Sequence, residues 1–175
     1  IGHGGKLRVR HYNAEGYLGS LTDFSGRTVR YEYYANGDAD GSAGDLKMAV
    51  SPVVVGLANG NNFPNGKATR YTYATGFADE RLNHNLLTVV DPKNQTWLRN
   101  TYAGTQDPTD LLFDRVIRQV HGNPGDIIDV TYRRETPTPE NDFAAVYALV
   151  NDRVGNVSER LYDTRNRPAT PQIFT

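Results

Sequence analysis

The sequence predicts an all-β protein in which repeated antiparallel β-hairpins form an extended, curved sheet. Tyr, which favours strands, contributes 11 of the 175 residues, and 17 glycines and 9 prolines supply turn residues. Apolar and polar residues alternate with a period of two over several short segments. Turns of the type Asp-x-x-Gly separate such segments, and Tyr102, Tyr132 and Tyr162 are regularly spaced, as in stacked hairpins of one kind.

The first complete unit begins with a turn at Asp23–Gly26 and continues as a strand over Thr28–Tyr33. Period-two patterning places Val29, Tyr31 and Tyr33 on one face of that strand. A second unit begins with the turn dipeptide Asn65-Gly66 and ends on the same Arg-Tyr-x-Tyr pattern. The remaining predicted strands are 85–90, 95–102, 114–120, 127–132, 145–150 and 157–163, and the remaining turns are 91–94, 121–126, 151–156 and 164–167.

Three stretches interrupt the pattern and are predicted to be surface loops of one segment that covers residues 1–175. Residues 35–44 and 56–64 are dense in Gly, Asn, Asp and Ala without periodicity, and residues 135–142 contain two prolines. Helix signals are sparse: residues 109–113 and 141–148 could form a turn or two of helix, and the second stretch competes with a strand.

Composition excludes several classes of function. The 19 basic and 20 acidic residues leave a net charge of −1, which argues against a binder of nucleic-acid backbones. The chain has no cysteine, so disulfides and thiol chemistry are excluded. No long apolar run predicts membrane insertion, and no signal peptide stands at the start, so we expect any export signal to lie elsewhere.

The sequence offers three kinds of candidate chemical site. The loop with Asn36, Asp38 and Asp40 resembles half of a calcium-binding loop, but Lys47 stands where the bidentate carboxylate would be, so a solvated turn is the alternative. Asp126 with Asp129, or Asp38 with Asp40, could serve as a glycosidase pair on spacing alone. The four histidines, which lack metal-ligand spacing, are His3, His11, His84 and His121. We therefore expect no catalytic residue and no cofactor.

The ordered recurrence of turn, strand and Tyr resembles the Rhs or YD-repeat proteins over most of residues 6–168. The motif is most complete from Asp152-Arg153-Val154-Gly155-Asn156 through Tyr162-Asp163 to Asn166-Arg167. It also stands at Tyr12–Leu18, and as Asp23-x-x-Gly26-Arg27 followed by Tyr31-x-Tyr33. The residues expected to form the repeat framework are Asp23, Gly26, Arg27, Tyr31, Tyr33, Tyr71, Tyr73, Asp91, Tyr102, Tyr132, Asp152, Gly155, Asn156, Tyr162 and Asp163.

The chain departs from the family pattern at some turns. Asn94 stands where Gly is expected, and Tyr73 and Tyr102 are followed by Ala rather than Asp. The family's self-cleaving Asp-Pro-x-Gly stretch is not matched by Asp107–Asp110. These departures leave the strand registers open.

The resemblance implies a structural role. In the family, which is related to insecticidal toxin complex shells and teneurin barrels, the repeats form a hollow shell around a C-terminal toxin or a cell-surface barrel. We therefore expect a non-catalytic shell segment of a larger bacterial protein, secreted or at the cell surface. Its partners would be the remaining repeats and the C-terminal cargo, with a secretion apparatus or surface receptor also considered. The alternatives are an adhesion, glycan-binding or protein-binding module, and a glycosidase.

Overall fold

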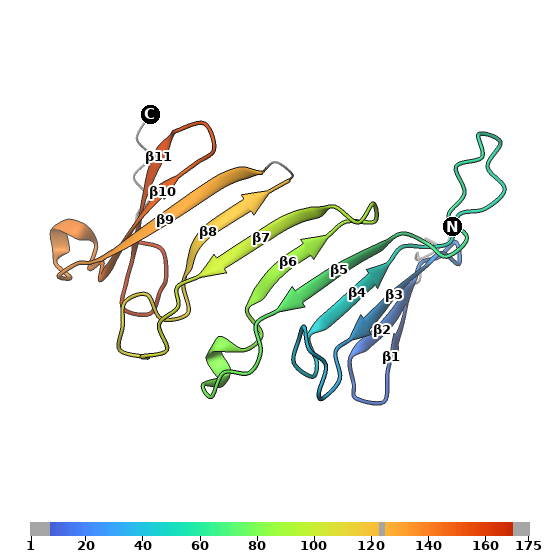
Figure 1. Ribbon diagram of the computed structural model, residues 1–175, viewed down its shortest axis with the longest axis horizontal. Helices are drawn as coiled ribbons and strands as arrows, with labels where there is room; N and C mark the ends of the chain where they lie inside the picture. Colours follow the sequence, from blue (N-terminus) through green and yellow to red (C-terminus); the bar gives the residue numbers. More distant parts are fainter. Residues whose placement is uncertain (1–7, 123–124, 170–175) are drawn as a thin grey trace, which may run out of the picture. The chain divides into compact units, whose positions relative to one another are not determined.

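A computed structural model describes residues 8–122 and 125–169, and it confirms the all-β prediction. Eleven strands lie in an antiparallel sheet in their chain order (Figure 1). The described part contains only two helical elements, the single 3-10 turns Glu80–Leu82 and Pro139–Asn141. It contains no helix of the length and apolar character needed to cross a membrane.

The chain divides into two compact units, residues 1–95 and 96–175, which are described separately. The first contains β1 (Val9–Tyr12), β2 (Leu18–Thr22), β3 (Thr28–Tyr33), β4 (Leu46–Val50), β5 (Ala68–Tyr73) and β6 (Leu86–Val90). The second contains β7 (Thr96–Tyr102), β8 (Val116–His121), β9 (Asp126–Arg134), β10 (Val146–Asn151) and β11 (Val157–Tyr162).

Strand β3 shows the predicted alternation between two faces. Arg30 and Glu32 are exposed, whereas Val29, Tyr31 and Tyr33 are partly buried. The pairing with β4 sets Arg30 opposite Val50 and Tyr31 opposite Ala49, so the alternation continues into the neighbouring strand.

Each unit has a shallow core, because the sheet is a single layer. Among the described elements, close backbone contacts join only strands that are adjacent in the sequence. The most buried apolar side chains of the first unit are Tyr34, Val50, Leu82 and Val89. Those of the second are Leu98, Ala144, Val146 and Ala148.

The same irregularity recurs at four hairpins. The register of each pair shifts by one residue next to a Tyr that ends the first strand, at Tyr12, Tyr33, Tyr73 and Tyr102. The second strand of each pair therefore carries one extra residue, which defines a β-bulge. The extra residues are Gly19, Lys47, Leu87 and Ile117.

The structure corrects several boundaries. Strand β4 was not among the expected strands, because its bulge residue Lys47 interrupts the alternation of faces. Strands β1 and β2 were expected only as part of the Tyr12–Leu18 motif. Residues 109–113 form turns without a helix, and the chain leaves helical geometry at Asp142 and Phe143, whose φ angles are 53° and 58°. Asn123 and Pro124, in the predicted turn 121–126, lie outside the described residues.

Candidate functional site

The turn at Asp23 shows how the repeat framework is held. The backbone N–H of Asp23 donates to the carbonyl of Arg27 at 2.9 Å, and Gly26 N–H donates to the carbonyl of Asp23 at 3.0 Å. Carboxylate oxygen Oδ1 accepts from the N–H groups of Ser25 at 2.9 Å and of Arg27 at 3.0 Å. One short acid thus satisfies two backbone donors that the tight turn would otherwise leave to water.

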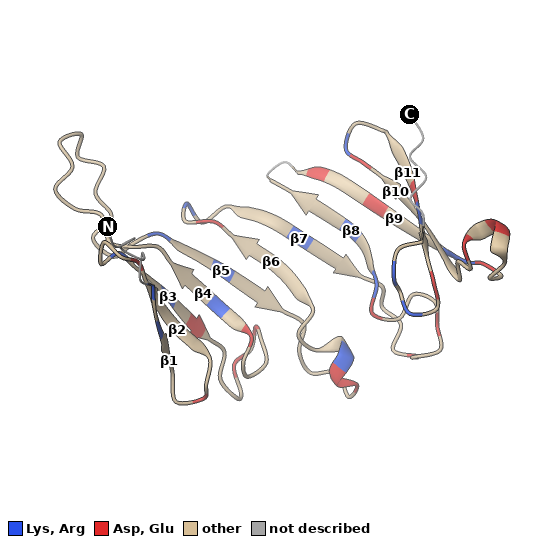
Figure 2. Cartoon of the chain, turned by 180° about the vertical axis from the view of Figure 1, so that it is seen from behind, with Lys and Arg blue, Asp and Glu red and all other residues tan. Residues whose placement is uncertain are grey.

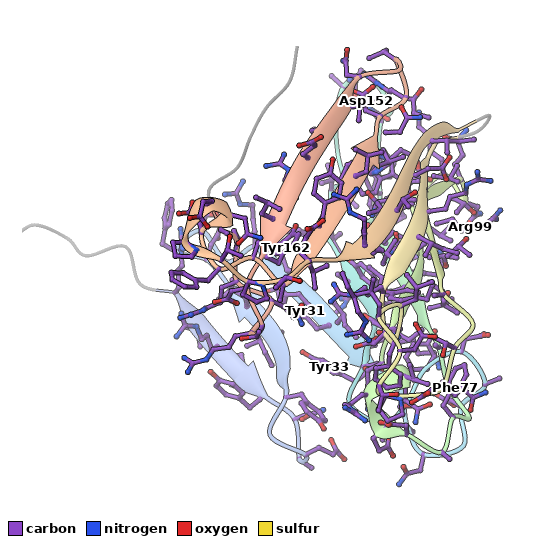
Figure 3. The ribbon with its side chains drawn as sticks, turned by 90° about the vertical axis from the view of Figure 1, so that its left-hand side faces the viewer. Tyr31, Tyr33, Phe77, Arg99, Asp152 and Tyr162 are labelled. Atoms are coloured by element: carbon purple, nitrogen blue, oxygen red, sulfur yellow. The ribbon has the colours of Figure 1, made fainter. Side chains whose placement is uncertain are left out.

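The same turn recurs at four other places. Each copy has the closing bond between its first and fifth residues and a first side chain that accepts from the fifth N–H. The copies begin at Asn13, Asp91, Asp152 and Asp163. Figure 3 labels Asp152 in the turn after β10 and Tyr162 at the other end of β11. The repeated motif therefore produces a repeated backbone geometry.

The fourth turn residue requires a positive φ in all five copies. Gly occupies it at Gly16, Gly26 and Gly155, with φ between 81° and 87°. Asn occupies it at Asn94 and Asn166, with φ of 61° and 56°. Asn tolerates the left-handed region better than other non-Gly residues, so the departure at Asn94 leaves the turn intact.

Longer loops are closed by a main-chain hydrogen bond of the same kind as the one that closes the short turns Asn13–Tyr17 and Asp163–Arg167. The residue after the strand donates its N–H to the carbonyl of the residue before the next strand at 2.8–2.9 Å. This bond closes the five loops 34–45, 51–67, 74–85, 103–115 and 135–145. Ala74 and Ala103 stand at the first position of two of these loops, where Asp or Asn begins the short turns.

Tyrosine hydroxyls cross-link neighbouring strands at the bulges. Tyr33 donates its hydroxyl to the carbonyl of Leu18 at 3.0 Å, and Tyr132 donates to the carbonyl of Val116 at 2.9 Å. Leu18 and Val116 are the first residues of the bulged strands β2 and β8. The Tyr residues therefore pack with their rings and satisfy a carbonyl with their hydroxyls.

Arginines pair across the strands of the second unit. Arg118 Nε lies 2.6 Å from Asp129 Oδ1 between β8 and β9, and the Arg133 guanidinium lies 4.4 Å from the centre of the Tyr147 ring between β9 and β10. These groups are exposed enough that solvent weakens each pair. In each pair the two residues stand directly opposite each other, so the contact favours the observed register and adds little stability.

Three of the turn carboxylates, Asp23, Asp152 and Asp163, are held in their charged form. Hydrogen bonds from Ser25 and Arg27 lower the pKa of Asp23 well below its usual range, although desolvation opposes the shift. The hydrogen bonds from Arg167, first its backbone N–H and then its side chain, lower the pKa of Asp163 to about 2. The pKa of Asp152 is also lowered, by hydrogen bonds from Asn156, Val154 and Gly155 that outweigh desolvation.

These shifts predict acid sensitivity. A folded-state pKa below the unfolded value of about 3.9 contributes stability above that pH, and the contribution is lost as the pH falls through the folded pKa. For Asp163 that window runs from about pH 4 to about pH 2. Urea unfolding followed by circular dichroism should show a decline there that is shallower in the triple variant Asp23→Asn, Asp152→Asn, Asp163→Asn. Equal slopes for both proteins would contradict this prediction.

In the loop that resembles a calcium site, Asp38 forms an ion pair with Lys47. Asp38 Oδ2 accepts from the N–H of Ala35 at 3.1 Å and lies 3.2 Å from Lys47 Nζ. The carbonyl of Asp40 accepts from the N–H of Tyr73 at 2.8 Å. Within the described residues, no group of three or more His, Asp or Glu side chains could hold a metal ion. The loop is joined to the neighbouring strand β5 by main-chain hydrogen bonding.

The histidines are dispersed. His84 Nδ1 lies 2.7 Å from Asp45 Oδ1, and His121 Nε2 lies 2.7 Å from Gln119 Oε1. His11 is exposed on β1, and His3 lies outside the described residues. Each of the three described histidines therefore stands in a different local environment.

Of the two carboxylate pairs predicted as glycosidase candidates, Asp126 and Asp129 do not face one another. Asp126 and Asp129 are three residues apart on β9, so their side chains leave opposite faces of the strand. Asp126 forms an ion pair with Arg153, and Asp129 forms one with Arg118. In the other candidate pair, Asp38 forms an ion pair with Lys47. A glycosidase needs two carboxylates on either side of one bond, which Asp126 and Asp129 do not provide.

One exposed aromatic side chain lies beside polar groups in the second unit. Trp97 is 55% exposed, and its ring meets the edge of His121 at a centroid distance of 5.6 Å. Both line an open pocket of about 450 Å³ together with Asp126 and Arg153. The sequence indicates Tyr-rich and Arg-rich strands but does not single out Trp97. Its contact with His121 depends on the pairing of β7 with β8, which the sequence does not reveal.

Neither a comparison with protein-family models nor one with curated proteins finds a match for this chain.

Proposed function

We propose that this chain is a non-catalytic structural segment of a YD-repeat shell, which encloses or displays a toxin or another effector of the same protein. The observation that carries the proposal is one five-residue turn repeated five times along a single-layered sheet. Tyrosines at the bulges add a second repeated feature that matches the turn-strand-Tyr motif of the family.

The single layer is the physical reason for a shell. A sheet without a second packed layer leaves apolar side chains on its faces in water, and repeat units gain stability from neighbours on either side. In each unit close backbone contacts join the described strands only to their sequence neighbours, so further repeats and an enclosed cargo would supply the missing contacts. The protein would act outside the cell or at its surface, with those repeats and the cargo as its partners.

The test is the native protein isolated from its source. Electron microscopy should show a hollow particle, and limited proteolysis should leave an enclosed fragment intact until the particle is opened by denaturant. A filled, compact particle without a protected fragment would overturn the proposal.

A surface-binding module is the second candidate, and Trp97 favours it. Its exposed ring, with His121, Asp126 and Arg153 around the same pocket, combines an apolar platform with hydrogen-bonding groups, as sugar-binding sites require. A glycan array probed with the wild-type chain and with Trp97→Ala distinguishes the two. Binding that disappears in the variant supports the module, and no binding by the wild type removes it.

A further inference from the structure

A pocket on the first unit gathers basic side chains on one face of the sheet. Strand pairing sets Arg70 of β5 opposite Met48 of β4, and Arg30 of β3 opposite Val50, so these side chains share a face. They line a pocket of about 640 Å³, to which Lys67 and Lys93 also contribute. We call it the basic pocket, defined by Arg30, Met48, Val50, Lys67, Arg70 and Lys93. Figure 2 shows basic residues in blue on β5 and in the turn after β6.

Among the residues that the structure describes, the four cations of the basic pocket have no carboxylate within ion-pair distance. In the described part of the first unit, Arg27, Lys47 and Arg81 each form an ion pair with an Asp. No such pair within 4.0 Å includes Arg30, Lys67, Arg70 or Lys93. The other described basic residues of this unit without such a pair are Arg8 and Arg10, which do not line the pocket, so the pocket gathers four of the six.

The pocket keeps an excess of positive charge. Its acidic lining residues are Glu32 and Asp91, and Asp91 Oδ1 already accepts from the N–H groups of Lys93 at 2.8 Å and Gln95 at 2.9 Å. Arg30 donates to the carbonyl of Asn65 at 3.4 Å, and Arg70 donates to Asn94 Oδ1 at 3.3 Å. Both bonds are long, so the guanidinium groups can exchange these acceptors for a stronger anionic one.

The floor of the pocket selects among anions. Met48 and Val50 are aliphatic and partly or fully buried between the two arginines. The pocket's aromatic ring, Phe63, has Lys67 Nζ at 4.0 Å from its centre, so one face of the ring is already occupied and less of it is left for stacking by a sugar or a base. Carboxylates suit the planar guanidinium forks, and an aliphatic side chain suits the floor between them.

We propose that the basic pocket binds an extended acidic peptide segment of a partner protein, in which carboxylate side chains flank an aliphatic one. The carboxylates pair with Arg30 and Arg70, the aliphatic side chain covers Met48 and Val50, and the lysines add long-range attraction. A volume of about 640 Å³ accommodates a few residues of such a segment. The inference does not depend on the chain being part of a shell.

The test measures binding of a fluorescent peptide that alternates glutamate and leucine, by anisotropy at low ionic strength. The wild-type chain is compared with Arg30→Gln/Arg70→Gln and with Arg99→Gln/Arg160→Gln, which removes the same charge from exposed positions in the other unit. We expect the first variant to bind at least ten-fold more weakly and the second to bind within two-fold of wild type. Circular dichroism melts verify that each variant is folded.

A charge reversal provides a second test at an exposed turn residue. Lys93→Glu leaves its backbone N–H free to bond Asp91 and should weaken the peptide at least five-fold. Equal weakening by both double variants, equal binding of a glutamine-leucine peptide, or tighter binding of oligogalacturonate or single-stranded DNA than of the acidic peptide would each overturn the proposal.

Discussion

Replacing Tyr34 by alanine is expected to lower the free energy of unfolding by about 3–5 kcal/mol, the usual range for removing a large aromatic side chain from a core. Tyr34 is only 8% exposed in a unit that has few buried side chains. Its hydroxyl donates to the carbonyl of Tyr71 at 2.8 Å, and its ring meets the ring of Tyr73 edge-on at 6.2 Å. Removing it would leave a cavity under a long loop.

The loop after Tyr34 depends on that ring. Tyr34 N–H closes the loop on the carbonyl of Asp45 at 2.9 Å, and Gly41 lies so close to the ring that a Cβ there would overlap it. Losing the ring would therefore also release the segment that carries Asp38 and Asp40. Chemical denaturation followed by circular dichroism measures the loss.

Two controls separate the contributions of the Tyr34 ring. Tyr34→Phe removes one hydrogen bond and should cost about 1 kcal/mol. Tyr12→Ala removes a ring that is 61% exposed, so its effect should stay within about 0.5 kcal/mol. If Tyr34→Ala were no more destabilising than Tyr12→Ala, the loop would not be held by the ring.

The second large effect is expected at Gly66, where alanine should cost about 2–4 kcal/mol. The φ angle of Gly66 is +76°, a left-handed conformation that strains any residue with a Cβ. A Cβ there would also overlap the carbonyl oxygen of Ser51 and lie 2.9 Å from Val50 Cγ1. The backbone oxygen cannot move aside, because the neighbouring N–H of Ser51 is bonded to the carbonyl of Lys67 at 2.9 Å.

Gly60 offers a matched control in the same connecting segment. Its φ is +70°, and a Cβ there would meet no atom within 4 Å. Gly60→Ala should therefore show the backbone strain alone, about 1–2 kcal/mol. Melting temperatures of the two variants measured side by side check the difference. A loss at Gly60 as large as at Gly66 would show that the overlap with Ser51 adds nothing.

The Gly66→Ala substitution is also expected to affect the basic pocket, because Gly66 is one of its lining residues. It lines that pocket between Asn65, whose carbonyl accepts from Arg30, and Lys67. Since Gly66→Ala would shift both neighbours, the variant should weaken peptide binding as well as folding. Gly60 is not among the lining residues, so Gly60→Ala should leave binding at the wild-type level.

Much of the fold could be predicted because its signals are local. The turn at Asp23 needs only a short acceptor at its first position and Gly or Asn at its fourth, and both are readable within five residues. The alternation over Thr28–Tyr33 likewise follows from the period of a strand. Strand β4 could not be predicted in this way, because the bulge at Lys47 breaks the period of two. A bulge is defined only by the pairing with a partner strand, so it cannot be recognised from one strand's sequence.

The sequence by itself therefore determined the fold class and the chemistry of the repeat turns. Only the tertiary structure decided which residues come together: Tyr34 under its loop, Trp97 beside His121, and Arg30 with Arg70 around an aliphatic floor. The physical reason is register. A one-residue shift moves a side chain to the other face of the sheet, and register is set by bulges and by hydrogen bonds between residues far apart in the chain.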